Sequence, residues 1–413
     1  MNTLIIRLLF LIPFVFSALS IQALITKFVS VNVGQIIAYL NVLLIIIGIF
    51  GILKTKDKQS YPKTITLWFV FFIAYYSLGF FANMVHNYEP PFLKTLIPVI
   101  YFIGFAQFLG NNENRSLFPK IVIITFTIAN LLLIYFQRIN FSMDYEGVYK
   151  YTLSRAGGVY GDANNAAVVC LLSFIFIKNF FITHNFLQKL IKQLCIGISL
   201  YALVLTFSNT GFIVLIIVLM ITYNYWFNPK RIIFLVIIVP IFSYFLFTSA
   251  LNSSYLNNIQ KARITNVVNI ITLNTSEVSD SGRGVLLQNM MNFVNENPFL
   301  GNGIYFSTEI RGHNTLIGIW ADAGIFTFLI FIILLLYYYK KAILSPSRIR
   351  IPTLSILLVL TIFMLTLQTI INQSYLIVLF AFMAYLMSNS DESQPDEHSI
   401  FANDNTPTTN NFI

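Results

Sequence analysis

The sequence has few charged residues. Aspartate, glutamate, lysine and arginine make up 10% of its 413 residues, against roughly 25% in a typical soluble domain. Hydrophobic residues make up 57%. A water-soluble fold could not remove that much apolar surface from solvent, whereas a lipid bilayer acts as the solvent for it. The composition excludes an ordinary soluble enzyme and predicts a single helical membrane domain.

Groups that bind metals or nucleotides are also scarce. The two cysteines, Cys170 and Cys195, lie in apolar runs and are interpreted as small buried hydrophobic residues. Three of the four histidines, His86, His184 and His398, are scattered without metal-ligand spacing. The sequence contains no glycine-rich nucleotide motif and no internal repeat. We therefore predict neither a metal nor a cofactor, and no nucleic-acid partner.

Long apolar runs fill most of the chain. A membrane-spanning helix needs about 20 mostly apolar residues, and this criterion predicts spans at 4–26, 33–53, 64–85, 92–110, 118–138, 162–182, 190–207, 210–227, 231–250, 313–339, 352–371 and 373–388. The first could pass for a signal peptide, but a second span follows at once, which favours a retained helix. The seventh and eighth spans, and the last two, are separated so briefly that they are either tight hairpins or partly re-entrant.

The distribution of positive charge predicts the orientation. With the N-terminus in the cytoplasm, the cytoplasmic connections hold 15 lysines and arginines, and the four short outer connections hold only Lys27 and Lys94. We predict an all-α, polytopic protein of about 12 transmembrane helices with both termini cytoplasmic. Residues 1–388 would form the membrane domain, including one large outer loop, 251–312, between spans nine and ten. Residues 389–413 are polar and acidic, which predicts a disordered cytoplasmic tail.

Arginines in the outer loops run against this charge pattern. Arg155 lies in the loop 139–161, and the loop 251–312 contains Arg263, Arg283 and Arg311. A guanidinium group can bind phosphate oxygens through two hydrogen bonds. The alternative is that each side chain extends to the lipid headgroups.

The segment 279–324 holds the most informative pattern. Apolar residues recur at helical spacing from 286 to 294 and stop at Asn297-Pro298, which predicts a short amphipathic helix at the outer membrane interface. Gly301 and Gly303 follow in a turn whose backbone could approach a ligand closely.

His313 comes next, at the predicted membrane boundary and beside Asn314. It is the best candidate for a general base, because imidazole titrates near neutral pH; the alternative is a solvated histidine at a helix start. Asp322 is the only carboxylate in the interior of a predicted span. We favour a bond from it to a neighbouring helix over a contact with His313, since nine helical residues place the two side chains on opposite faces.

A second polar segment runs from Ser154 to Asn165 and leads into the sixth span. Its last two residues, Asn164 and Asn165, would either cap that helix or contact a polar substrate.

These segments resemble the O-antigen polymerase and O-antigen ligase superfamily of bacterial envelopes. The matching motifs are R-x-G-G…D-x-N-N at 155–165, S-x-T-G at 208–211, and R…N-P-x-x-G-x-G…H-N-x-x-L…D-x-G from Arg283 to Gly324. Asp322 stands where the family more often has glutamate.

The resemblance implies a metal-independent glycosyltransferase of the bacterial inner membrane that uses undecaprenyl-diphosphate-linked glycans at the periplasmic face. His313 would be the base. Arg283 and Arg155 would hold the diphosphate, with Arg311 and Arg263 next, and Asn314, Gly301, Gly303, Asn164, Asn165 and Asp322 would support the site. Other expected partners are membrane lipids, a chain-length regulator and further glycan-assembly proteins.

Polymerase and ligase activities both fit these motifs. We favour the polymerase because polymerases are the more numerous group among such matches. A protein O-glycosylating relative would carry an extra outer segment after the histidine, where this chain has short connections. A transporter would need polar groups deep in several spans, and a scaffold would not need the outer arginines and histidine.

Overall fold

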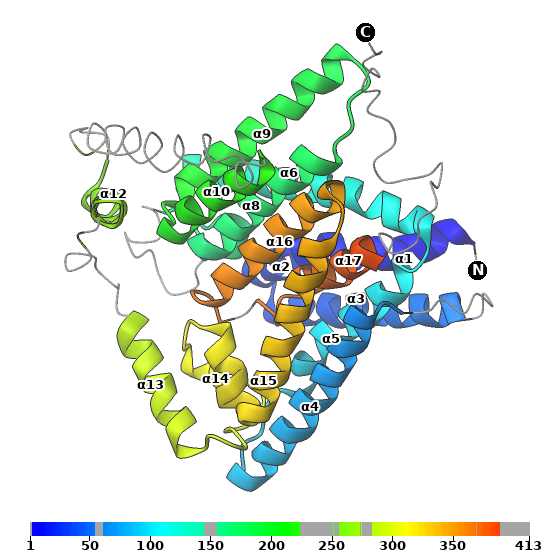
Figure 1. Cartoon of the computed structure of the whole chain (residues 1–413), viewed down its shortest axis with the longest axis vertical. Coiled ribbons are helices and arrows are strands. Elements are labelled where there is room, and N and C mark those ends of the chain that lie inside the picture. Colours follow the sequence, from blue (N-terminus) through cyan, green and yellow to red (C-terminus); the bar gives the residue numbers. More distant parts are fainter. Residues whose placement is uncertain are drawn as a thin grey trace, which may run out of the picture.

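The structure, a computed structural model, describes residues 2–53, 61–143, 155–223, 251, 256–272, 274, 283–368 and 370–388. Within these ranges all regular structure is helical and no strand occurs (Figure 1). This confirms the predicted all-α class.

The structure describes sixteen helical elements within these ranges. Their bounds are α1 (Thr3–Ala18), α2 (Ile21–Phe28), α3 (Val31–Leu53), α4 (Lys63–His86), α5 (Phe92–Phe108), α6 (Asn112–Arg138), the 3-10 turn η1 (Gly158–Tyr160), α8 (Ala163–Phe180), α9 (Phe186–Thr206), α10 (Asn209–Thr222), α12 (Asn258–Ile271), α13 (Arg283–Glu296), α14 (Phe306–Ile310), α15 (Thr315–Leu344), α16 (Ser347–Met364) and α17 (Ser374–Ser388).

Seven helices in the described part are long and apolar enough to cross a membrane: α3, α4, α6, α8, α9, α15 and α16. The shorter apolar helices α5, α10 and α17 coincide with three further predicted spans. The ninth predicted span, 231–250, falls outside the described residues. The chain is thus a multi-pass membrane protein, and twelve spans remain a prediction.

The first predicted span is not one continuous helix. α1 and α2 meet at an angle of 61°. The backbone N–H groups of Leu19 and Ser20 bond back to carbonyls of α1, and Ser20 adopts a left-handed conformation with φ 48°. The single helix predicted over 4–26 is therefore wrong, because the chain turns at Ser20 before α2 begins.

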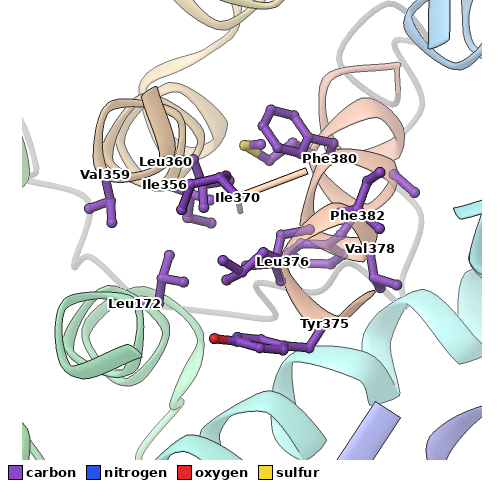
Figure 2. Packing of buried hydrophobic residues seen from close by; sticks show 14 of the residues in the cluster. Leu172, Ile356, Val359, Leu360, Ile370, Tyr375, Leu376, Val378, Phe380 and Phe382 are labelled. Carbon is purple, nitrogen blue, oxygen red and sulfur yellow. The ribbon is translucent and has the colours of Figure 1, made fainter. Parts of the chain in front are cut away.

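The short helix α17 lies in the interior of the bundle. Every residue from Ser374 to Met387 is buried, and the helix packs against α1, α4, α5, α15 and α16. Its side chains interleave with those of α8 and α16, as Leu172, Ile356 and Leu376 illustrate (Figure 2). A helix that is apolar all round is expected in such a position.

The outer helices present apolar side chains outward. In α3 the buried residues are Gly34, Asn41, Ile45, Gly48 and Gly51, and its other large aliphatic side chains are exposed or half-buried. Small residues allow close helix approach in membranes, and a Cβ added at Gly48 would lie 2.6 Å from the α1 ring of Phe10. Exposed apolar surface of this extent fits contact with lipid.

The connections predicted to be outside the membrane contact one another at one end of the bundle. These contacts join Lys27 to Ser142 and His86 to Gly301. In addition, Tyr160 and Arg155 of the loop 139–161 bond to the last residues of α1 and α9, Ala18 and Thr206. At the predicted cytoplasmic side, Arg7 pairs with Glu113 at 2.5 Å. The grouping of the connections agrees with the charge pattern, and which end faces the periplasm stays a prediction.

Candidate active site

The segment between α13 and α14 forms a loop that docks on α15. α13 ends at Glu296, as the Asn297-Pro298 pair predicted. Asn302 N–H donates to the Ala321 carbonyl at 2.7 Å, and Gly303 N–H donates to the Asp322 carbonyl at 2.9 Å. The docked loop, residues 297–304, thus takes its shape from the backbone of a membrane-spanning helix.

A break in α15 makes these carbonyls available. Ala323 and Gly324 have non-helical backbone angles, and Gly324 has φ 76°. Where a helix is interrupted, backbone groups of the adjoining turns lose their helical partners. Ile325 N–H donates to the Pro298 carbonyl at 3.0 Å. A Cβ at Gly324 would lie 1.9 Å from the Phe299 carbonyl oxygen, so only glycine fits here.

Asp322 fastens this region to a neighbouring helix. Its carboxylate accepts hydrogen bonds from the Tyr75 hydroxyl of α4 at 2.6 Å and from the Ser307 backbone N–H at 2.7 Å. The Ser307 hydroxyl donates to the same group at 3.1 Å. Asp322 is 2% exposed, and a buried carboxylate needs such partners. The expected bond to a neighbouring helix is present.

Two further α4 residues hold the docked loop. The Asn83 side chain accepts from Ile304 N–H at 2.7 Å and donates to the Tyr88 carbonyl at 3.1 Å. The His86 ring lies 3.2 Å from the Gly301 carbonyl oxygen. No sequence pattern predicted a role for Asn83 or His86 in such a site. A polar amide in an apolar span was the available signal for Asn83.

His313 lies two residues before α15, in the connection that follows the short helix α14. It is half-buried and has φ 49°, a left-handed conformation that is uncommon for residues other than glycine. Asn314 caps α15, since its side chain accepts from Ile317 N–H at 3.0 Å. Arg311, two residues earlier, is exposed and also left-handed, with φ 58°. Such backbone conformations cluster at functional sites, so the segment 311–313 is a candidate for one.

Arg155 lies in a second polar cluster with the turn between α9 and α10. Its Nε donates to the Thr206 carbonyl at 3.2 Å, and its terminal nitrogen donates to the Asn164 side chain at 3.4 Å. The Ser208 hydroxyl donates to the same Asn164 oxygen at 2.8 Å. The structure therefore brings two of the family-like motifs together, although 44 residues separate Asn164 from Ser208.

Asn164 and Asn165 do not cap α8, which was one of the two roles predicted for them. Asp162 caps the helix by accepting from the N–H groups of Asn164 and Asn165. Neither asparagine is the cap, because the preceding carboxylate satisfies those donors. Their side chains are instead engaged elsewhere: Asn164 with Arg155, and Asn165 with Gln373, whose amide donates to it at 2.7 Å.

The connection between α16 and α17 joins the two clusters. At one end, Gln373 bonds to Asn165. At the other, the Thr315 hydroxyl donates to the Leu367 carbonyl and accepts from Ile370 N–H. Because Thr315 follows the His313-Asn314 pair, the histidine and the arginine cluster flank the same connection.

The remaining arginines are not placed at these clusters. Arg263 is half-buried on α12, a helix that contacts α10. Arg283 begins α13, but its side chain lies outside the described part of the protein. The convergence of all four arginines stays a prediction. In the described ranges, no group of three or more histidine, cysteine or acidic residues could hold a metal ion.

Residues 194–332 match the family model described as O-Antigen ligase. The resemblance to the O-antigen polymerase and ligase superfamily is confirmed. The matching segment runs from α9 into α15 and contains Ser208, the docked loop, His313 and Asp322. No curated protein matches the chain. The family supports a membrane enzyme of the O-antigen polymerase or ligase type that transfers glycan in polysaccharide biosynthesis.

Proposed function

We propose that this protein polymerises undecaprenyl-diphosphate-linked oligosaccharide repeat units, of the O-antigen or capsule type, on the periplasmic face of the bacterial inner membrane. The observation that carries the proposal is the position of His313. It lies within the family match, two residues before α15, the helix whose break at Gly324 accommodates the docked loop. A general base must be positioned rigidly at the reacting group.

The residues divide the chemistry between them. His313 takes the proton from the attacking sugar hydroxyl. The diphosphate gains negative charge as the bond between sugar C1 and oxygen breaks, and positioned guanidinium groups stabilise that charge. Arg155 and Arg283 are the proposed diphosphate ligands, supported by Arg311 and Arg263. Arg155 is held by Thr206 and Asn164, which reduces the side-chain entropy lost on binding.

The topology follows from the charge pattern. Loop 251–312 would be periplasmic, and the N-terminus and the tail 389–413, which falls outside the described residues, would be cytoplasmic. The lipid tail of the substrate would lie against the apolar helices while its diphosphate stays at headgroup level. No cofactor or metal takes part in the proposed reaction, and a chain-length regulator is an expected partner.

Ligation is the second candidate, because the matched family model is described as O-Antigen ligase. A ligase would transfer finished glycan from the same carrier to lipid A-core. The donor, the base and the leaving group would be unchanged. Only the acceptor distinguishes the two reactions, so the site chemistry supports both. An experiment in cells, where both acceptors are present, can distinguish them.

The test is a His313→Ala strain, with His184→Ala as the control. His184 is an exposed histidine in the connection between α8 and α9, at the other end of the bundle. If the protein is a polymerase, the His313 variant leaves lipid A-core with at most one repeat unit. If it is a ligase, long glycan accumulates on undecaprenyl diphosphate and none reaches lipid A-core. Normal long surface glycan in this strain, at normal protein level, would contradict both.

A further inference from the structure

A polar cavity lies beside the Arg155 cluster, at the break between α1 and α2. Its volume is about 260 Å³, near the lower end of the range of roughly 300–1,000 Å³ for small-molecule sites. It is bounded by Ser17 and Ser20 at the break, Tyr160 of η1, Asn165 of α8 and the start of α17.

The chemistry of the lining is uniform. Its eight residues are serines, tyrosines, asparagines and a glutamine, and none carries a carboxylate, ammonium or guanidinium group. Some lining groups are bonded to one another, as Tyr375 is to Gln373. By contrast, the side chains of Ser17, Ser20 and Asn372 make no hydrogen bond within the described part of the chain. Such a lining suits a neutral ligand rich in hydroxyl groups, because each hydroxyl both donates and accepts.

Consecutive residues connect this cavity to the arginine. Asn164 bonds to Arg155, and Asn165 lines the cavity. Successive side chains on a helix point about 100° apart, so one turn of α8 serves both sites. A sugar joined to a diphosphate has the same arrangement, in which a neutral hydroxylated ring lies one bond from a charged group.

We propose that this cavity is a subsite for the sugar ring next to the diphosphate of the lipid-linked glycan. The proposal rests on the proposed function, since it takes Arg155 to hold the diphosphate. The break at Ser20 contributes to this subsite because the cavity forms where the chain turns from α1 into α2. A straight helix would not turn away at this position.

Two variants on separate elements test the subsite. Ser17→Leu places a bulky apolar group in the cavity from α1. Asn372→Leu removes an exposed amide from the connection before α17, where a change of side chain is tolerated easily. Asn179→Leu is the matched control, since Asn179 lies at the opposite end of α8 from Asn165.

The measurement compares two probes on the purified full chain in lipid nanodiscs. One is the lipid-linked glycan that accumulates in a strain lacking this protein. The other is undecaprenyl diphosphate without sugar. We expect the unaltered protein and Asn179→Leu to bind the glycosylated lipid more tightly. Each cavity variant should weaken its binding about fivefold to tenfold, the effect of losing a hydrogen bond, and leave binding of the sugarless lipid unchanged.

The outcomes separate the two proposals. If both cavity variants bind the glycosylated lipid as the unaltered protein does, the subsite is wrong while the proposed function stands. If the unaltered protein binds the two lipids equally, the sugar subsite is wrong; if it binds neither lipid, the proposed function fails as well. If Ser17→Leu does not fold, Asn372→Leu decides.

Discussion

The bond between Tyr75 and Asp322 offers a quantitative test of how the docked loop is held. Tyr75→Phe removes one hydroxyl that donates to a buried carboxylate at 2.6 Å. A hydrogen bond to a charged group contributes about 1.5–3 kcal/mol, so we expect a loss of about that size in the free energy of unfolding. Asp322→Asn should cost a similar amount, because its amide nitrogen cannot accept from Tyr75 or from the Ser307 hydroxyl.

The two changes should not be additive. Both remove the same bond, so the double variant should be less destabilised than the sum of the single variants by about 1–2 kcal/mol. Tyr385→Phe is the control partner, since its hydroxyl is bonded to the Ala106 carbonyl in a different part of the bundle. Combined with Asp322→Asn, it should be additive within about 0.5 kcal/mol.

Unfolding in mixed micelles, followed by tryptophan fluorescence, measures these energies. Trp320 is a suitable reporter because its indole N–H donates to the Pro298 carbonyl of the docked loop at 2.8 Å. Additivity of the Tyr75 and Asp322 changes, equal to that of the control pair, would refute the reasoning that this bond holds the loop against α4.

Three further expectations follow from the structure. Gly324→Ala should lower the free energy of unfolding by at least about 1–3 kcal/mol from backbone strain alone. Gly197→Ala, with nothing within 4 Å of the added Cβ, should be neutral or stabilising in the same unfolding assay. Equal effects of the two substitutions would contradict the break in α15. In intact cells without other cysteines, an impermeant thiol reagent should label a cysteine at the exposed position Glu296 but not at the exposed position Lys189; the reverse pattern would invert the topology. Arg155→Lys should lower glycan synthesis at least tenfold, because lysine keeps the charge but not the two-pronged geometry; full-length glycan at normal expression would exclude a bidentate role.

The sequence predicted those features that depend on local pattern. Apolar runs predicted the helical class, and Asn297-Pro298 predicted the end of α13. Two pairs of the connections that charge predicted to be outside contact each other, at Lys27–Ser142 and His86–Gly301, while the side that faces the periplasm stays a prediction. These features depend on composition and nearest neighbours, which a single chain displays directly.

Other features arise only from contacts between distant segments. The break at Gly324 falls inside an apolar run that predicts a continuous helix, and it is stabilised by the docked loop, which begins 27 residues earlier at Asn297. The Tyr75–Asp322 bond joins residues 247 positions apart. The turn at Ser20 lies in a run that also satisfies the criterion for a span. Periodicity carries no information about which residues pair, so the sequence predicted a bond from Asp322 to a neighbouring helix but not its partner Tyr75.

Glycosyl transfer itself is tested most directly with the purified protein and its proposed substrate, the lipid-linked repeat unit. The repeat unit is isolated from a strain that lacks the protein. Release of undecaprenyl diphosphate and growth of the glycan are followed together, with and without a metal chelator. We expect turnover by the unaltered protein and by His184→Gln, no effect of the chelator, and a rate for His313→Gln that is about 10²–10⁴-fold lower. Failure of the unaltered protein to release undecaprenyl diphosphate, or an unchanged rate for His313→Gln, would contradict the proposal.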